Sequence, residues 1–230
     1  MYRPSLFLVL ALALLFPAAA GAVSFEKALR NPDPTGKYLF YLHGAIMEKQ
    51  GKNATSKRYG TYMYDQIIKH FEDRDLIVID EVRGTTNPHK YASKIVGQIH
   101  RLMAAGIPSG NITVAGFSKG GHIALLIASS LRQPDVGFVI MAGCGKGITA
   151  RSFNQFLKAK RGARLKGRIY SIYASSDLEA GSCRDAIAQS SGEGLRFHEN
   201  RIKTGKGHGL FYQPRPEWIN PTAIFARGGR

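Results

Sequence analysis

A serine between two glycines is the residue of this sequence best suited to nucleophilic chemistry. Residues 112–116 are mostly β-branched, Gly-Phe-Ser-Lys-Gly follows at 116–120, and the apolar stretch 122–131 is typical of a buried helix. A strand that turns into a helix within one residue strains the central residue and exposes its side chain, and it leaves room only for small neighbours. The pattern therefore predicts that Ser118 is a nucleophile. The alternative is a structural turn whose serine only caps the helix.

A serine hydroxyl needs two partners, an imidazole that takes its proton and a carboxylate that orients the imidazole. The sequence offers both after Ser118. His208 lies in a glycine-rich loop past the last predicted strand, and Asp177 directly follows the strand before it. Glu179, two residues further on, is the main alternative to Asp177. Asp185 is a weaker alternative because it falls in a predicted helix.

The elements that must position these side chains alternate between strands and helices. Strand-like runs recur at residues 37–43, 76–80, 112–116, 136–141, 168–174 and 195–201. Segments with helical periodicity separate most of them, at about 64–71, 91–103, 123–131 and 149–158. This alternation predicts an α/β fold with a mostly parallel, doubly wound sheet and helices on both faces. No repeat or linker divides residues 23–230, which we expect to form a single domain.

This order of elements resembles the α/β-hydrolase fold, with the serine motif where that family places its nucleophile. The match covers about residues 37–215, and the predicted strands would be the third to the eighth of the family. The resemblance therefore implies that the N-terminal edge hairpin is reduced or missing. It also places the acid and the histidine after the last two strands, at Asp177 and His208. Only one helix fits between residues 141 and 168, where many lipases insert a large cap, so we expect a minimal, uncapped hydrolase.

Backbone N–H groups should hold the negative charge that develops on an attacked carbonyl. Lys119, the residue after the nucleophile, supplies one of them. His43-Gly44-Ala45 resembles the family's H-G-x signature, so the second N–H is expected from Ala45, with Gly44 as the alternative. His43 and His122 are expected to be packed histidines rather than catalysts.

Two features bear on the compartment of the protein. Residues 1–22 combine Arg3, an apolar run and small residues before position 23, which is the pattern of a signal peptide. We therefore expect an exported protein, periplasmic or secreted. Cys144 and Cys183 are the two cysteines of the chain, and both follow predicted strands at the same edge of the sheet. In an oxidising compartment we expect them to form a disulfide.

The formal net charge of +16 is spread along the chain rather than gathered in a tail. A basic surface of this kind favours acidic substrates or anionic envelope components, without a motif for specific nucleic-acid recognition. Residues 44–60 carry several of the cations and form either a flap over Ser118 or a solvated loop. Metal-binding, dinucleotide-binding and phosphate-binding motifs are absent, so we expect neither a metal nor a cofactor.

The sequence thus predicts an exported serine hydrolase for a small-molecule ester or thioester, with an amide as a further option. Ser118, His208 and Asp177 would form and hydrolyse an acyl-enzyme, and Lys119 would favour substrates that carry negative charge. The alternative is a catalytically inactive protein on the same scaffold that binds anionic envelope components.

Overall fold

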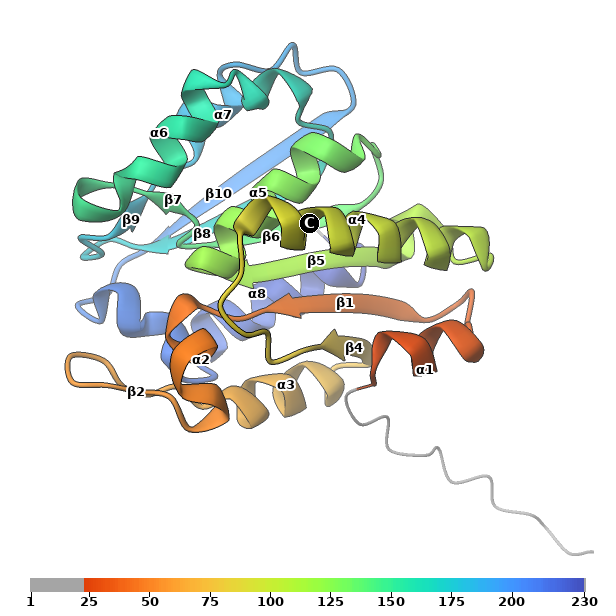
Figure 1. The fold of residues 1–230 in the computed structure, drawn as a ribbon, viewed down its shortest axis with the longest axis horizontal. Coiled ribbons are helices and arrows are strands. Elements are labelled where there is room, and N and C mark those ends of the chain that lie inside the picture. The colour runs from red at the N-terminus through yellow and green to blue at the C-terminus, as the bar shows by residue number, and fades with distance from the viewer. Residues whose placement is uncertain (1–22, 230) are drawn as a thin grey trace, which may run out of the picture.

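A sheet of six parallel strands runs through the centre of the protein (Figure 1). The computed structural model describes residues 23–229, and the predicted signal peptide lies outside them. The strands follow each other across the sheet in the order β10-β8-β6-β5-β1-β4. Their bounds are β1 Lys37–Leu42, β4 Leu76–Asp80, β5 Ile112–Phe117, β6 Gly137–Met141, β8 Gly167–Ala174 and β10 Leu195–Ile202. All six predicted strands are therefore present, with ends within one residue of those expected.

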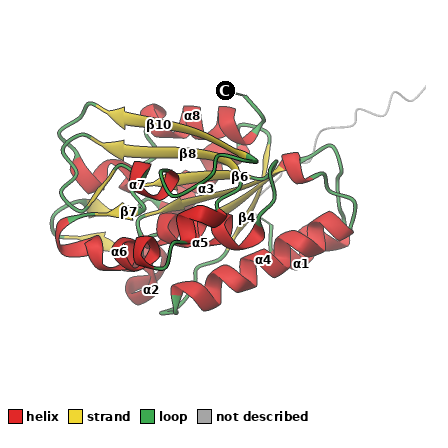
Figure 2. Ribbon diagram, turned by 90° about the horizontal axis from the view of Figure 1, so that it is seen from above, coloured by secondary structure: helices red, strands yellow, loops and turns green. Residues whose placement is uncertain are grey.

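Helices cover both faces of this sheet, as predicted (Figure 2). One face carries α1 Phe25–Arg30, α4 Pro88–Ala104, α5 Lys119–Leu131, α6 Ala150–Lys158 and α7 Arg184–Ile187. The other face carries α2 Ala45–Gln50, α3 Tyr64–Glu72 and α8 Pro216–Ala226. Alternate side chains of a strand point to opposite faces, so Phe40 packs in the first core and Tyr41 in the second. The central strands are consequently apolar on both sides.

The remaining elements are short. Two small antiparallel ladders pair β2 Thr55–Ser56 with β3 Gly60–Thr61, and β7 Cys144–Gly145 with β9 Ala180–Gly181. Single turns of 3-10 helix are η1 Gly51–Asn53, η2 Ser109–Asn111, η3 Gly147–Thr149, η4 Arg161–Arg164 and η5 Gly207–Tyr212. The segment 44–60, expected as a flap or a solvated loop, thus consists mainly of α2, η1 and the β2-β3 hairpin. Its buried Ala54 accepts a hydrogen bond from the N–H of Tyr62, 2.8 Å away, which anchors the hairpin to the domain.

The structure has no large cap and no N-terminal edge hairpin within residues 23–229. Only β7, η3, α6 and η4 lie between β6 and β8. Strand β4 forms one edge of the sheet, and Val23 covers part of it by donating a hydrogen bond to Val78, with N and O 2.9 Å apart. In the described part of the chain, no helix is both long enough and apolar enough to cross a membrane.

Cys144 and Cys183 form the predicted disulfide, with their Cα atoms 5.3 Å apart. Cys144 belongs to β7, which follows β6, and Cys183 comes just after β9, which follows β8. The bond therefore ties together the loops that leave two strands at the same end of the sheet. Asp177 lies between β8 and β9, inside the segment that this crosslink encloses.

We expect removal of the disulfide by Cys144→Ala with Cys183→Ala to lower the free energy of unfolding by about 4 kcal/mol. The crosslink joins residues 39 positions apart and restricts the unfolded chain accordingly. Urea denaturation of the oxidised wild type and of the double variant measures the difference. Wild-type protein kept in a reducing agent is the control and should match the variant. Equal stability of the oxidised and reduced proteins would contradict the expectation.

Candidate active site

Ser118 occupies the sharp junction between β5 and α5, with φ 54° and ψ −116°. A positive φ is strained for a residue with a side chain, and such strain persists only where the surroundings enforce it. Here the N–H of Ser118 donates to the carbonyl of Met141 at 2.8 Å, and its own carbonyl accepts from the N–H of His122 at 2.9 Å. Both hydrogen bonds hold the strained conformation.

The glycines on either side of Ser118 are required by close backbone contacts. A Cβ added at Gly116 would lie 2.2 Å from the carbonyl oxygen of Gly120. One added at Gly120 would lie 2.0 Å from the carbonyl oxygen of Leu42, at the end of β1. No side chain fits at either position, which is the constraint expected from the sequence motif.

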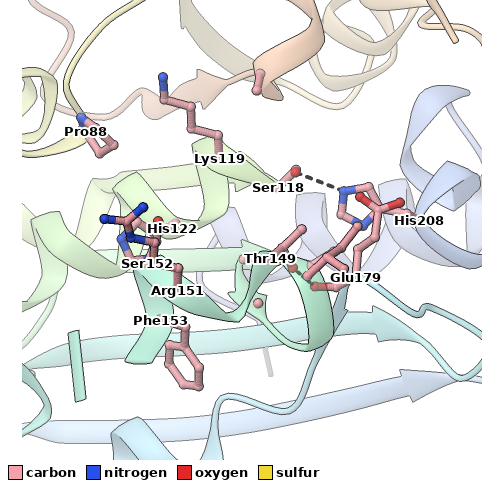
Figure 3. A pocket seen from close by; sticks show the side chains of 15 residues that line it. Pro88, Ser118, Lys119, His122, Thr149, Arg151, Ser152, Phe153, Glu179 and His208 are labelled. Carbon is pink, nitrogen blue, oxygen red and sulfur yellow. Dashed lines mark hydrogen bonds between the residues drawn. The ribbon is translucent and has the colours of Figure 1, made fainter. Parts of the chain in front are cut away.

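A continuous chain of hydrogen bonds joins Ser118, His208 and Asp177. Figure 3 shows its first link, between Ser118 and His208. The Nε2 atom of His208 lies 2.9 Å from the Oγ of Ser118, and its Nδ1 atom lies 2.9 Å from the Oδ2 of Asp177. Because a carboxylate accepts, Nδ1 carries the hydrogen and Nε2 is free to accept from the serine hydroxyl. Asp177 and His208 are both buried. This arrangement can transfer the hydroxyl proton to His208.

The surroundings of Asp177 favour its ionised form. Burial alone would raise the pKa of this carboxyl group. The hydrogen bond and the charge of His208 lower the pKa, as do the N–H groups of Glu179 and Ala180, which donate to Oδ1 at 2.8 and 3.1 Å. The net effect is a pKa below the ordinary value of aspartate. Asp177 can therefore stabilise a positively charged His208.

The alternative acids do not contact His208. The carboxylate of Glu179 instead accepts a hydrogen bond from the hydroxyl of Tyr59, with the two oxygens 2.5 Å apart. Asp185 lies in α7. Tyr59, in the β2-β3 hairpin, also packs its ring 6.1 Å from the ring of His208. Sequence reasoning missed Tyr59, because no local motif relates a tip residue of this hairpin to a histidine in η5.

The two predicted N–H donors lie next to the nucleophile. Ala45 and Lys119 are the first residues of α2 and α5, so neither N–H has an acceptor within its own helix. Neither donates to another of the described residues. Both residues line the same cleft as Ser118 and His208, and a Cβ added at Gly44 would lie 3.7 Å from the Cβ of Ser118. The cleft has a volume of about 400 Å³.

A buried cluster of charges lies behind these two N–H groups. Glu48, on α2, bridges the Nε of Arg83 at 2.9 Å and the Nζ of Lys119 at 2.6 Å. The side chains of Glu48 and Arg83 are only 4% and 2% exposed. Arg83 also donates to the carbonyl of His43, the residue that precedes the Gly44–Ala45 turn. One carboxylate thus links the turn before α2 to the residue after the nucleophile.

The side chain of Lys119 is not a free cation in the cleft. The sequence-based expectation that Lys119 favours negatively charged substrates required it to be one. Besides its ion pair with Glu48, its ammonium group donates to the carbonyl of Thr86 at 2.8 Å. Figure 3 shows the side chain directed away from Ser118. The reason is the buried carboxylate of Glu48, which the sequence pattern did not reveal as a partner.

His43 is a packed residue, as expected. Its Nε2 atom accepts from the N–H of Arg83 at 2.9 Å, so the hydrogen is on Nδ1, which donates to the carbonyl of Gly44 at 2.8 Å. Burial, reinforced by the positive charge of Arg83, lowers the pKa of His43 to about 4. The ring is therefore neutral around pH 7 and fixes the start of the turn. His122 is also buried, but its ring lines the cleft.

Comparison with known proteins identifies the fold. No family model and no curated protein sequence matches the chain. The crystal structure of SOBER1 from Arabidopsis thaliana aligns over 84% of this chain and 98% of its own, with a TM-score of 0.55 and 11% identity. A monoacylglycerol lipase from Paleococcus ferrophilus aligns over 84% and 96%, with a TM-score of 0.55 and 13% identity. The esterase PE8 aligns over 92% and 95%, with a TM-score of 0.54 and 15% identity.

These likenesses, together with the parallel sheet and its helical layers, show that the chain has the α/β-hydrolase fold. The resemblance inferred from the sequence is thereby confirmed at the level of the fold. Among residues 23–229, no group of three or more His, Cys, Asp and Glu side chains is arranged to hold a metal ion.

We expect Glu48→Gln to lower the free energy of unfolding by about 3 to 5 kcal/mol, because it leaves buried Arg83 without its counter-charge. Glu81→Gln is the matched control. Its partner Lys94 and Glu81 itself are both almost half exposed, so the loss should be below about 1 kcal/mol. Denaturant unfolding at pH 7 compares the two variants. Equal losses would show that the buried cluster contributes no more than a surface ion pair.

The neutral state of His43 makes stability depend on pH. An unfolded histidine takes up a proton below its ordinary pKa of 6.5, whereas folded His43 does so only near pH 4. Between these values the unfolded state binds more protons, so the free energy of unfolding falls as pH falls from about 6.5 to about 4. The loss from this residue should approach about 3 kcal/mol.

His43→Gln should reduce this pH dependence, whatever its effect on stability at pH 7. Unfolding measured at several pH values from neutral to acid for both proteins gives the difference. His100→Gln, an exposed substitution on α4, controls for the loss of a histidine. Parallel curves for the wild type and His43→Gln would contradict the assignment of a neutral, buried His43.

Proposed function

We propose that this protein is a serine hydrolase that cleaves an ester or thioester of a small molecule, with Ser118 as the nucleophile. One observation carries the proposal, namely the hydrogen-bonded chain from Asp177 through His208 to a serine held at a strained strand-to-helix turn. A serine that only capped the helix would need neither the strain nor the two partners. The names of solved structures with this fold, a monoacylglycerol lipase and an esterase among them, support the same reaction class.

The first half of the reaction forms the acyl-enzyme. The Oγ of Ser118 attacks the carbonyl carbon while the Nε2 of His208 accepts its proton. Negative charge on the carbonyl oxygen is stabilised by the N–H groups of Ala45 and Lys119. His208 then donates the proton to the leaving oxygen or sulfur, and the bond from this atom to the carbonyl carbon breaks. Asp177 holds the tautomer of His208 and stabilises its charged form.

The second half releases the acid. A water molecule replaces the departed alcohol or thiol, and His208 takes one of its protons as the water oxygen attacks the acyl carbon. Return of this proton to Oγ breaks the bond to Ser118 and restores the free serine. No electron transfer and no co-reactant other than water is needed.

We also propose that the protein acts outside the cytoplasm. The signal-peptide pattern of residues 1–22 and the disulfide between Cys144 and Cys183 support export to an oxidising compartment. The single domain proposed for residues 23–230 contains every residue of the proposed site. Specific recognition of nucleic acid is not part of the proposal.

A fluorophosphonate probe should label the wild-type protein at Ser118 and should not label Ser118→Ala. With an aryl ester as substrate, Ser118→Ala and His208→Ala should each lower kcat by roughly 10⁴ to 10⁶, and the double variant should lose little more. Asp177→Asn should lower kcat by a somewhat smaller factor.

Glu179→Gln is the matched control for the acid, since Glu179 is the neighbouring carboxylate that does not contact His208. It should keep probe labelling and most of the activity. An active Asp177→Asn together with an inactive Glu179→Gln would overturn the assignment of the acid. A wild-type protein that the probe leaves unlabelled would support the alternative, a catalytically inactive binding protein.

A further inference from the structure

A second cavity continues from the cleft at Ser118. It has a volume of about 390 Å³ and shares Pro88, His122 and Ser152 with the first cleft. The shared lining places the two cavities side by side along α5, and we refer to the pair as the groove. Ser118, His122 and Leu126 are four residues apart in sequence and face the same side of that helix. At 1.5 Å per residue, the groove extends about 12 Å from the nucleophile.

The walls of this extension come from the beginning of α4 and from α6, and η4 closes its far end. Asn87, Pro88 and His89 line one side, and Gln155 and Phe156 line the other. Arg161 of η4 completes the lining. The extension is thus a polar channel between helices rather than an apolar acyl pocket.

The charge of the extension is positive. Arg161 lines it, and no aspartate or glutamate does. His89 also lines it, but burial and the charge of Arg161 lower the pKa of His89, so Arg161 carries the charge at pH 7. Arg151 lines the cleft on the side of Ser118, where Glu179 is the acidic residue of the lining. Among residues 23–229, neither the guanidinium of Arg151 nor that of Arg161 forms a hydrogen bond or an ion pair. Arg83 and Lys119 differ in that both are paired with Glu48.

His122 lies where the two cavities meet. The residue is 8% exposed, and its Nδ1 atom is buried without a hydrogen-bond partner among the described residues. Burial, together with the nearby charges of His89 and Arg161, lowers the pKa of His122 to about 4, so the ring is neutral at pH 7. A buried polar atom without a partner is costly. The ring of His122 nevertheless lines both cavities, so a ligand bound in either would lie against it.

We infer that this extension of the groove binds an anionic group, a carboxylate or a phosphate, that belongs to the molecule whose ester is cleaved at Ser118. Arg161 supplies the charge, and the ring of His122, about one helical turn after Ser118, lines both cavities. The inference rests on the proposed function and narrows its substrate to esters or thioesters with an anionic end several atoms from the scissile bond. It also assigns the preference for negative charge to residues other than Lys119.

Two series of substrates test the inference. The first is the mono-4-nitrophenyl esters of straight-chain dicarboxylic acids of increasing length, which carry the anion on the acyl side. The second is the acetyl thioesters of mercapto acids, which carry it on the leaving side. Each is compared with the neutral compound that ends in a carboxamide, and with the analogue that ends in a phosphate. Rates are measured at low ionic strength, where charge attraction is not screened.

At the best chain length, kcat/KM should be roughly tenfold higher for the anion than for the carboxamide in at least one series. Arg161→Gln should bring this ratio close to one. Lys158→Gln, an exposed change on α6 that removes the same charge outside both cavities, should preserve the ratio. If the ratio of kcat/KM to that of the carboxamide is larger for the phosphate than for the carboxylate, the site binds a phosphate group; if it is smaller, the site binds a carboxylate. A ratio near one in both series, or equal effects of the two variants, would overturn the inference.

A readout without turnover separates this inference from the proposed function. In Ser118→Ala labelled with ¹⁵N-histidine, suberate or inorganic phosphate should shift the ring signals of His122, and Arg161→Gln should remove the shift. Fluorophosphonate labelling of Ser118 in an otherwise wild-type Arg161→Gln protein tests the nucleophile alone. Labelling without any anion effect would refute the inference and leave the hydrolase intact. A shift of the His122 signals by an anion, without labelling of Ser118, would support the anion site and refute the hydrolase.

Discussion

The reversal of the chain at Ser118 is the constraint on which the rest of the site depends. The turn brings the start of α5 so close to the end of β1 that a Cβ at Gly120 would lie 2.0 Å from the carbonyl oxygen of Leu42 and 2.8 Å from that of His43. The backbone approach that strains Ser118 therefore also fixes where β1 ends. The turn through Gly44 and Ala45 begins at that point, so Ser118 and the N–H groups beside it are positioned by one contact between two backbones.

Charge is arranged around this contact in two distinct ways. Behind the N–H groups, Glu48 is buried between Arg83 and Lys119, and it fixes the side chains that surround the turn. Replacing such a buried ion pair by apolar residues is often neutral or stabilising, so its presence here is better explained by positioning than by stability. Along the groove, neither Arg151 nor Arg161 forms an ion pair within the described part of the chain. The two cations behind the turn are thus paired with a carboxylate, whereas these two are not.

The fold class was predictable from the periodicity of the sequence, and the meeting of three residues from the resemblance of the order of elements to the α/β-hydrolase fold. Six apolar runs separated by helical segments predict a parallel sheet, and the carboxyl ends of parallel strands lie at one edge. Residues just past β5 and β8 and in the loop after β10 therefore meet there, which brings Ser118, Asp177 and His208 together. Gly116 and Gly120 could also be recognised from the sequence, because the turn at Ser118 leaves no room for a larger residue at either position.

The contacts that sequence reasoning missed join residues far apart in sequence, and hydrophobic periodicity does not predict such contacts. Tyr59 reaches His208 from the tip of a short hairpin, and Glu48 reaches Lys119 across 71 positions of sequence. The side chain of Lys119 was expected near the substrate because its position in the motif is fixed, but the motif fixes only its backbone. Likewise, the burial of His122 was foreseen, whereas its unpartnered nitrogen became visible only with the neighbouring helices in place.

The absence of a large cap has a consequence for how a covalent intermediate would be resolved. A lid that closes over an active site excludes water and so protects an acyl-enzyme for transfer to another acceptor. Here β6 leads through a short loop and α6 directly to β8, and the cleft beside Ser118 opens to solvent. Bulk water, present at far higher concentration than any metabolite, would reach the acyl carbon without a gating step. Partitioning of the intermediate should then favour hydrolysis over acyl transfer, unless an acceptor is itself held in the groove.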